Sequence, residues 1–343
     1  MDQWQYLYQA EKEGEGKFVQ APLTLDLTLA DHEVLVEPKR VSFCGTDLHV
    51  LRSYVGPGLA LGHEWTGVVK ALGKGVKTLH VGDVVTSATT LGCGQCEYCL
   101  EGEEQLCTQG ERLGAGKRGA FCSLLKLPED FLLRLKKDEL DSGVVLEPLA
   151  VAYESLRLLK RQGFSPLGKK VLILGAGAIG LLEAWLMKKE GAQVTLFEID
   201  QNRLALAQKI GFEAQRFEMG LLDQSLRAAF DVVIDAAGSS LPSKEAFRYL
   251  HFFGRKRFVA LLVGKYKTEL ALPLPLVQTQ QAHYLWQASL PRKSLEFCYQ
   301  VHQADLSFLA SVLLSESQPH PQINTAYLMA QNKSLAPRVV ISI

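Results

Sequence analysis

Four cysteines occupy one short segment with the spacing C-x2-C-x2-C-x7-C: Cys93, Cys96, Cys99 and Cys107. This spacing lets four thiolates converge on a single ion, and zinc in closed structural sites binds sulfur ligands in a tetrahedron. A [4Fe–4S] cluster, which also uses four cysteines, is the alternative. Crowding of cysteines in a chain without a recognisable secretory signal favours metal thiolates over disulfides. The sequence therefore predicts a structural metal site here.

A thiolate, an imidazole and a carboxylate lie upstream, in Cys44-Gly45-Thr46-Asp47-Leu48-His49 and Gly62-His63-Glu64. These are three zinc ligand types, and a catalytic zinc needs about three protein ligands with a fourth position open. Each motif alone is also compatible with a buried cysteine or a structural histidine–glutamate pair. Cys44, His63 and Glu64 are thus candidate ligands of a second, catalytic zinc.

A glycine motif follows the apolar run Val171–Leu174, with Gly175, Gly177 and Gly180 in the pattern G-x-G-x-x-G. In a dinucleotide-binding turn the first glycine permits the turn, the second admits the pyrophosphate, and the third lets helix and strand pack closely. The context of a strand before the motif and a helix after it supports this interpretation.

The acid Glu198 stands 18 residues after Gly180, at the end of the next apolar run. An acid at that place hydrogen-bonds the adenosine ribose and repels a 2′-phosphate, which favours NAD over NADP. Arg203 complicates the choice, since an arginine there can join the acid at the ribose or receive a phosphate.

The secondary structure that must position these residues follows two different sequence patterns along the chain. The first third has short apolar stretches between glycine and charged turns, which indicates β-structure. From about Val151 strands and helices alternate, which predicts βαβ units and a parallel sheet. A chain of 343 residues also exceeds what one core usually organises. We expect an α/β protein with a catalytic domain at 1–150, a cofactor domain at 151–287, and a return to the first domain at 288–343.

Individual elements can be placed from the pattern. We expect strands at Glu33–Val36, Thr66–Val69, Asp83–Thr86, Lys170–Leu174, Gln193–Phe197, Phe230–Ile234 and Arg257–Leu262, helices at Ile179–Lys189 and Gln201–Ile210, and a last strand within Arg338–Ile343 that pairs back into the first domain.

Taken in order, the motifs resemble those of the zinc-containing medium-chain alcohol and polyol dehydrogenases, a family that includes sorbitol, L-threonine and cyclitol dehydrogenases. The resemblance runs from about Glu33 to Ile343 and includes Gly82-Asp83-Val84-Val85 and Glu147-Pro148-Leu149-Ala150. It implies a doubly wound parallel-sheet Rossmann domain for NAD, a mainly β, GroES-like catalytic domain, and two zinc ions per chain.

The resemblance assigns roles to single residues. Cys44 and His63 become ligands of the catalytic zinc, and Glu64 a ligand or its immediate neighbour. Glu147 matches a carboxylate placed at the metal directly or through water, although a carboxylate facing the helix dipole is the alternative. Asp47 would accept a hydrogen bond from the His63 ring and fix its tautomer.

The expected reaction is hydride transfer between a secondary alcohol and NAD. A zinc-bound alkoxide would form as Thr46 accepts the hydroxyl proton, and His49, whose pKa suits the solvent end of a relay, would pass it on. A surface role for His49 is the alternative. Ile179 and Leu262 would lie against the cofactor, with plain core packing as the other interpretation.

The substrate class favoured is a polyol, sugar or cyclitol. An L-threonine-type 3-hydroxy amino acid dehydrogenase is the alternative, because it shares Cys-Gly-Thr-Asp. A medium-chain NAD(P)-binding protein without alcohol dehydrogenase activity would lack the cysteine cluster, and a zinc-binding interaction module would have no use for the glycine motif. The segment between His49 and His63 is several residues shorter than usual in the family, which alters a wall of the substrate pocket.

Composition limits the partners. Thirty-seven basic and thirty-seven acidic residues give zero formal charge, so nothing steers the chain to nucleic acid or to an anionic membrane. The apolar run Val171–Met187 is shorter than the ~20 residues that cross a bilayer. We expect a cytoplasmic homodimer or homotetramer whose partner is a small alcohol or ketone.

Overall fold

The computed structural model describes residues 3–218, 220, 223–238, 246–266, 269, 271–287, 289–332 and 336–343. The chain forms two units, Met1–Ala150 with Ser289–Ile343, and Val151–Ala288. Helix α3 (Leu146–Arg161) carries the chain from the first unit into the second.

The first unit is mainly β. Its main sheet has the order β10-β6-β5-β3-β18-β17, with β9 also paired to β3, and β1 lies between β2 and β4 in a smaller sheet. The strands are β1 (Trp4–Ala10), β2 (Lys17–Pro22), β3 (Glu33–Ser42), β4 (Gly56–Ala60), β5 (Glu64–Leu72), β6 (Val84–Ser87), β7 (Thr90–Leu91), β8 (Glu111–Arg112), β9 (Leu125–Pro128), β10 (Leu132–Leu135), β17 (Gln318–Pro319) and β18 (Val340–Ser342).

Short helices lie between these strands: α1 (Gly45–Leu51), α2 (Glu97–Glu101), α8 (Arg292–His302), α9 (Leu306–Leu313) and α10 (Ile323–Gln331). The core of the unit includes edge-to-face aromatic contacts of Phe18 with Tyr8, Phe43, Phe121 and Tyr327. Such pairs add to the stabilisation from buried apolar area.

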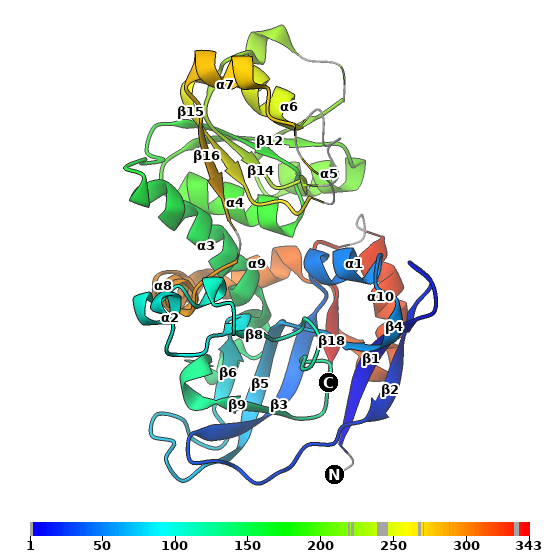
Figure 1. Ribbon diagram of the computed structural model, residues 1–343. Coiled ribbons are helices and arrows are strands. Elements are labelled where there is room, and N and C mark those ends of the chain that lie inside the picture. The colour runs from blue at the N-terminus through cyan, green and yellow to red at the C-terminus, as the bar shows by residue number, and fades with distance from the viewer. Residues whose placement is uncertain are drawn as a thin grey trace. The chain divides into compact units, whose positions relative to one another are not determined.

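The last segment of the chain belongs to the first unit. Strand β18 pairs antiparallel with β3, with Val340 opposite Ser42 and Ser342 opposite Arg40, and Figure 1 shows this red strand beside blue β3. The pairing places the chain's last residues directly beside the segment that carries Cys44.

The second unit is built around a parallel sheet with the strand order β13-β12-β11-β14-β15-β16. This is the order of a Rossmann fold, so the predicted doubly wound α/β domain is confirmed. Strands β11 and β14 are almost entirely buried, as expected for parallel strands covered on both faces. The elements are β11 (Lys170–Leu174), α4 (Ala178–Lys189), β12 (Gln193–Glu198), α5 (Gln201–Lys209), β13 (Glu213–Arg216), β14 (Phe230–Asp235), α6 (Ala246–Phe253), β15 (Gly254–Leu262), α7 (Leu274–Gln280) and β16 (His283–Trp286).

The predicted elements agree with these bounds to within a few residues at most ends. The largest differences are at β3, which continues to Ser42, at β5, which ends at Leu72 rather than Val69, and at β15, which begins at Gly254 rather than Arg257. Among the described residues, no helix combines the length and apolarity needed to cross a membrane.

Candidate metal and cofactor sites

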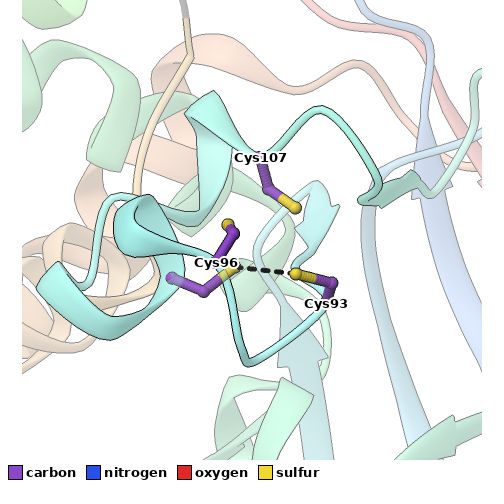
Figure 2. A group of neighbouring side chains, drawn as sticks. Cys93, Cys96 and Cys107 are labelled. Carbon is purple, nitrogen blue, oxygen red and sulfur yellow. Dashed lines mark hydrogen bonds between the residues drawn. The ribbon is translucent and has the colours of Figure 1, made fainter.

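The four clustered cysteines converge in space. The sulfurs of Cys93, Cys96, Cys99 and Cys107 all lie within 4.8 Å of one another, and those of Cys93 and Cys99 are 4.0 Å apart. Figure 2 shows the labelled side chains directed toward a common point. Sulfurs bound tetrahedrally to zinc at about 2.3 Å lie about 3.8 Å apart. The arrangement therefore fits one zinc ion, and none of the seven cysteines forms a disulfide.

The local backbone explains how so short a segment can close on an ion. Cys96 caps the N-terminus of α2, and a 3-10 turn at Glu104–Leu106 delivers Cys107. Gly92 lies so close to the site that a Cβ there would stand 2.6 Å from the Cys99 sulfur. A larger residue at position 92 would displace the Cys99 sulfur.

A second group of ligand types forms at the start of β5. Atoms of Cys44, His63 and Glu64 lie within 4.8 Å of one another, and the His63 and Glu64 side chains are buried. The donor set is one thiolate, one imidazole and one carboxylate. It fits a zinc site with three protein ligands.

Helix α1 holds two of the groups around this site. Its N-cap is Cys44, whose sulfur accepts from the Thr46 N–H at 3.4 Å, and Asp47 accepts from the Cys44 N–H at 2.9 Å. The buried Asp47 carboxylate also lies 3.4 Å from His63 Nδ1. That contact leaves the Nε2 atom of His63 for a metal, in the way expected of a partner that fixes the tautomer.

Glu64 has a partner that the sequence analysis did not single out. Arg338 Nε donates to both carboxylate oxygens of Glu64, at 2.8 and 3.0 Å, and the Ser42 hydroxyl also donates to Glu64. Although burial alone would raise it, Arg338 and His63 hold the pKa of Glu64 below its usual value. In the sequence, the one sign of this partner was that Arg338 is a single charged residue at the start of the apolar run that forms β18.

Glu147 stands beside this group and is not among the three mutually close ligands. It lies in the first turn of α3, is 5% exposed, and its Oε1 accepts from the Thr89 hydroxyl at 2.8 Å. Burial raises the pKa of Glu147 to about 7, an effect that Glu64 increases and that His63 and Thr89 oppose. The electrostatic influence of His63 and Glu64 places Glu147 near the site.

The two residues assigned to a proton relay lie on α1. Thr46 and His49 are three residues apart on this helix and both are half-buried. Side chains with that spacing share a helix face. The two side chains therefore lie on one face of α1.

The glycine motif has the expected strand–turn–helix geometry. Gly175 follows β11 with φ 98°, and Gly177 is the N-cap of α4. A Cβ at Gly180 would come within 1.8 Å of the Gly175 carbonyl oxygen. The third glycine is therefore required by the packing of the helix against the turn.

Glu198 ends β12 with a buried carboxylate that is already engaged by backbone. Its Oε2 accepts from the Ala176 N–H at 2.7 Å, and its Oε1 accepts from the Ile199 and Asp200 N–H groups at 2.8 and 2.9 Å. The acid thus ties the glycine turn to the end of β12. Two lone pairs on each oxygen leave Oε2 with capacity for one further donor.

The remaining predicted cofactor residues surround the same edge of the sheet. Arg203 lies over the glycine turn, with Nη1 3.7 Å from where a Gly177 Cβ would stand. Leu262 ends β15 and is buried, whereas Ile179 in α4 is half-buried. The carboxyl ends of parallel strands at the switch between β11 and β14 are where open α/β sheets bind ligands.

Comparison with known proteins fits both units. Residues 30–137 match the alcohol dehydrogenase GroES-like domain family. The sorbitol dehydrogenase of Halalkalibacterium halodurans is 31% identical over 68% of this chain and 71% of its own length. The L-threonine 3-dehydrogenase of Streptomyces coelicolor is 29% identical over 71% of this chain and 74% of its own length. The crystal structure of galactitol-1-phosphate dehydrogenase from Escherichia coli has a TM-score of 0.84, 21% identity, and coverage of 99% of this chain and 100% of that chain.

These similarities confirm the resemblance that the motifs indicated. The family is of the zinc type, and the four cysteines are a candidate zinc site. The chain belongs to the zinc-dependent medium-chain alcohol and polyol dehydrogenase family, and it is an NAD(P)-linked alcohol dehydrogenase.

Proposed function

We propose that the chain oxidises a secondary alcohol of the polyol, sugar or cyclitol class with NAD, using a zinc held by Cys44, His63 and Glu64. The observation that carries this proposal is the approach of their three ligand atoms to within 4.8 Å of one another. Bound there, zinc supplies a Lewis acid that makes a substrate hydroxyl more acidic.

Each site residue has a proposed role in the reaction. Thr46 accepts the proton that the hydroxyl releases, and His49 carries it toward solvent. Bound NAD would supply the hydride acceptor, and the overall products would be a ketone, NADH and a proton. Glu147 acts at the metal through water, and Cys93, Cys96, Cys99 and Cys107 hold the structural zinc.

The unit Val151–Ala288 is the cofactor domain in this account. Gly175, Gly177 and Gly180 receive the pyrophosphate, and Glu198 gives its remaining acceptor to the adenosine ribose. A carboxylate at this point repels a 2′-phosphate, which favours NAD over NADP. Arg203 and the side chains of Ile179 and Leu262 complete the cofactor site.

A second candidate substrate class is supported by a specific observation, the similarity to L-threonine 3-dehydrogenases. The same metal and relay residues would serve a 3-hydroxy amino acid. The two classes differ in the amine and carboxylate that a pocket must recognise.

The deciding experiment is a screen of polyols, cyclitols, sugars and 3-hydroxy amino acids with NAD and NADP, following absorbance of the reduced cofactor. Oxidation of a polyol or cyclitol supports the proposal, and oxidation of L-threonine alone supports the second candidate. Absence of turnover with every alcohol would contradict both. Cys44→Ser should remove all turnover while the protein stays folded.

The proposed assembly is a homodimer or homotetramer in the cytoplasm. Strand β16 ends the parallel sheet, and Trp286 on it is 55% exposed, which suits an interface between sheet edges. Thiolates kept free for zinc suit a reducing compartment. Light scattering of the purified protein tests the assembly, and a monomer would contradict it.

A further inference from the structure

The hydrogen bond from Thr89 to Glu147 lies at the edge of the candidate catalytic site. Thr89 Oγ1 donates to Glu147 Oε1 at 2.8 Å across 58 residues of sequence. Because a hydroxyl has one proton to give, this bond commits the hydroxyl to one oxygen of the carboxylate. It fixes the position of Oε1 and thereby limits where Oε2 can point.

Thr89 itself is held by the backbone around it. Its carbonyl oxygen accepts from the Leu113 N–H at 2.9 Å, and the following residues, β7, pair with β8. The preceding strand β6 pairs with β10 up to Ser87, so the hydroxyl projects from a segment that is held on both sides. A donor so anchored can hold a buried side chain in one orientation.

The position of Glu147 decides whether the candidate zinc site has three or four protein ligands. Cys44, His63 and Glu64 form the mutually close group, and Glu147 stands outside it. A catalytic zinc uses three protein ligands and leaves the fourth position for substrate. A fourth protein ligand would fill that position.

We propose that Thr89 is a positioning residue that holds Glu147 beside the metal and so keeps the fourth position open for the substrate hydroxyl. The inference rests on the proposed function. Without the Thr89 donor, the Glu147 carboxylate is released and turns toward the cation, where it competes with substrate.

The test compares Thr89→Val, which keeps the shape and removes the donor, with Thr89→Ser, which keeps the donor. The neighbouring Thr90→Val is a matched control, because within the described residues the buried Thr90 hydroxyl has no hydrogen-bond partner. The readouts are the visible absorption spectrum of the cobalt-substituted protein, kcat and KM. Bands missing from cobalt-substituted Cys44→Ser identify the catalytic site.

We expect Thr89→Val to change the catalytic-site bands, because a carboxylate then takes the fourth position in place of solvent. We also expect kcat/KM to fall by about 10- to 100-fold, the usual effect of losing a hydrogen bond that orients the groups around a metal. Thr89→Ser should restore both, and Thr90→Val should change neither. A Thr89→Val protein with the wild-type spectrum overturns the inference, whether or not its activity falls. Failure of the wild-type protein to bind cobalt at Cys44 or to oxidise any alcohol would instead overturn the proposed function.

Discussion

Arg338 and Glu64 form a buried ion pair that joins the last strand segment to β5. The guanidinium Nε lies 2.8 Å from one carboxylate oxygen and 3.0 Å from the other, and the two side chains are 7% and 0% exposed. Arg338 Nη2 is also 3.9 Å from the Cys44 sulfur. Arg338 therefore places a positive charge next to two of the candidate zinc ligands, Cys44 and Glu64.

Removing Arg338 should be costly. Arg338→Met leaves the Glu64 charge buried without its partner, and breaking a buried pair from one side destabilises a protein by about 3–5 kcal/mol. Urea unfolding measured by tryptophan fluorescence checks this. Lys160→Met, which removes the half-exposed pair with Glu190, is the control and should cost at most about 1 kcal/mol. Equal decreases in the free energy of unfolding of the two variants would show that the buried Arg338 pair stabilises the protein no more than an exposed pair does.

The two glycines Gly177 and Gly180 should respond differently to alanine. A Cβ at Gly180 meets backbone at 1.8 Å, whereas a Cβ at Gly177 meets only an Arg203 nitrogen at 3.7 Å. Gly180→Ala should therefore disturb the packing of α4 and lower the melting temperature. Gly177→Ala should fold as the wild type does and bind NADH more weakly, because the proposed pyrophosphate site lies against this glycine.

Circular dichroism melting and NADH fluorescence titration separate the two effects. The expectation fails if Gly180→Ala melts at the wild-type temperature, or if Gly177→Ala binds NADH as tightly as the wild type.

Glu183 should make stability depend on pH. This residue of α4 is fully buried, and within the described part of the chain neither of its carboxylate oxygens has a hydrogen-bond partner in good geometry. The nearby Ser155 hydroxyl donates to Gln287. Burial raises the pKa of Glu183 to about 8, with Ser155 opposing the shift only in part.

The direction of this pH dependence follows from the number of protons that Glu183 binds in the folded and unfolded states. The unfolded chain releases this proton near pH 4.5 and the folded protein near pH 8. Between these values the folded state holds more protons, so the contribution to stability is full below the lower value and is lost toward pH 8. The slope is at most about 1.4 kcal/mol per pH unit. Urea unfolding from pH 5 to 9 should show this decline in the wild type and a flatter profile in Glu183→Gln; parallel profiles would refute the assignment.

Local sequence patterns predicted the parts of the structure that local geometry determines. The four cysteines lie within 15 residues, so their spacing alone limits how they can meet. The glycine motif is equally local, since Gly175 and Gly180 contact each other across one turn. Parallel strands buried on both faces left long apolar runs, which is why β11 and β14 were found with nearly correct bounds.

Contacts between distant segments could not be predicted in this way. Arg338 and Glu64 are 274 residues apart, and Thr89 and Glu147 are 58 apart, so only the tertiary fold brings each pair together. Glu198 shows a further limit. Its place at a strand end was evident, but the three backbone groups that occupy it depend on how β12 ends beside the glycine turn.

Zinc content tests the central claim most directly, because the chain offers two separate ligand sets. The purified protein should contain two zinc ions per chain by elemental analysis. Cys44→Ser should retain one, stay folded and lose alcohol oxidation, whereas Cys99→Ser should lose the other and melt at a lower temperature. Cys122→Ser, a buried cysteine outside both sets, should keep both ions. A wild-type protein with one zinc, or a Cys44→Ser variant with full zinc and full activity, would contradict the account.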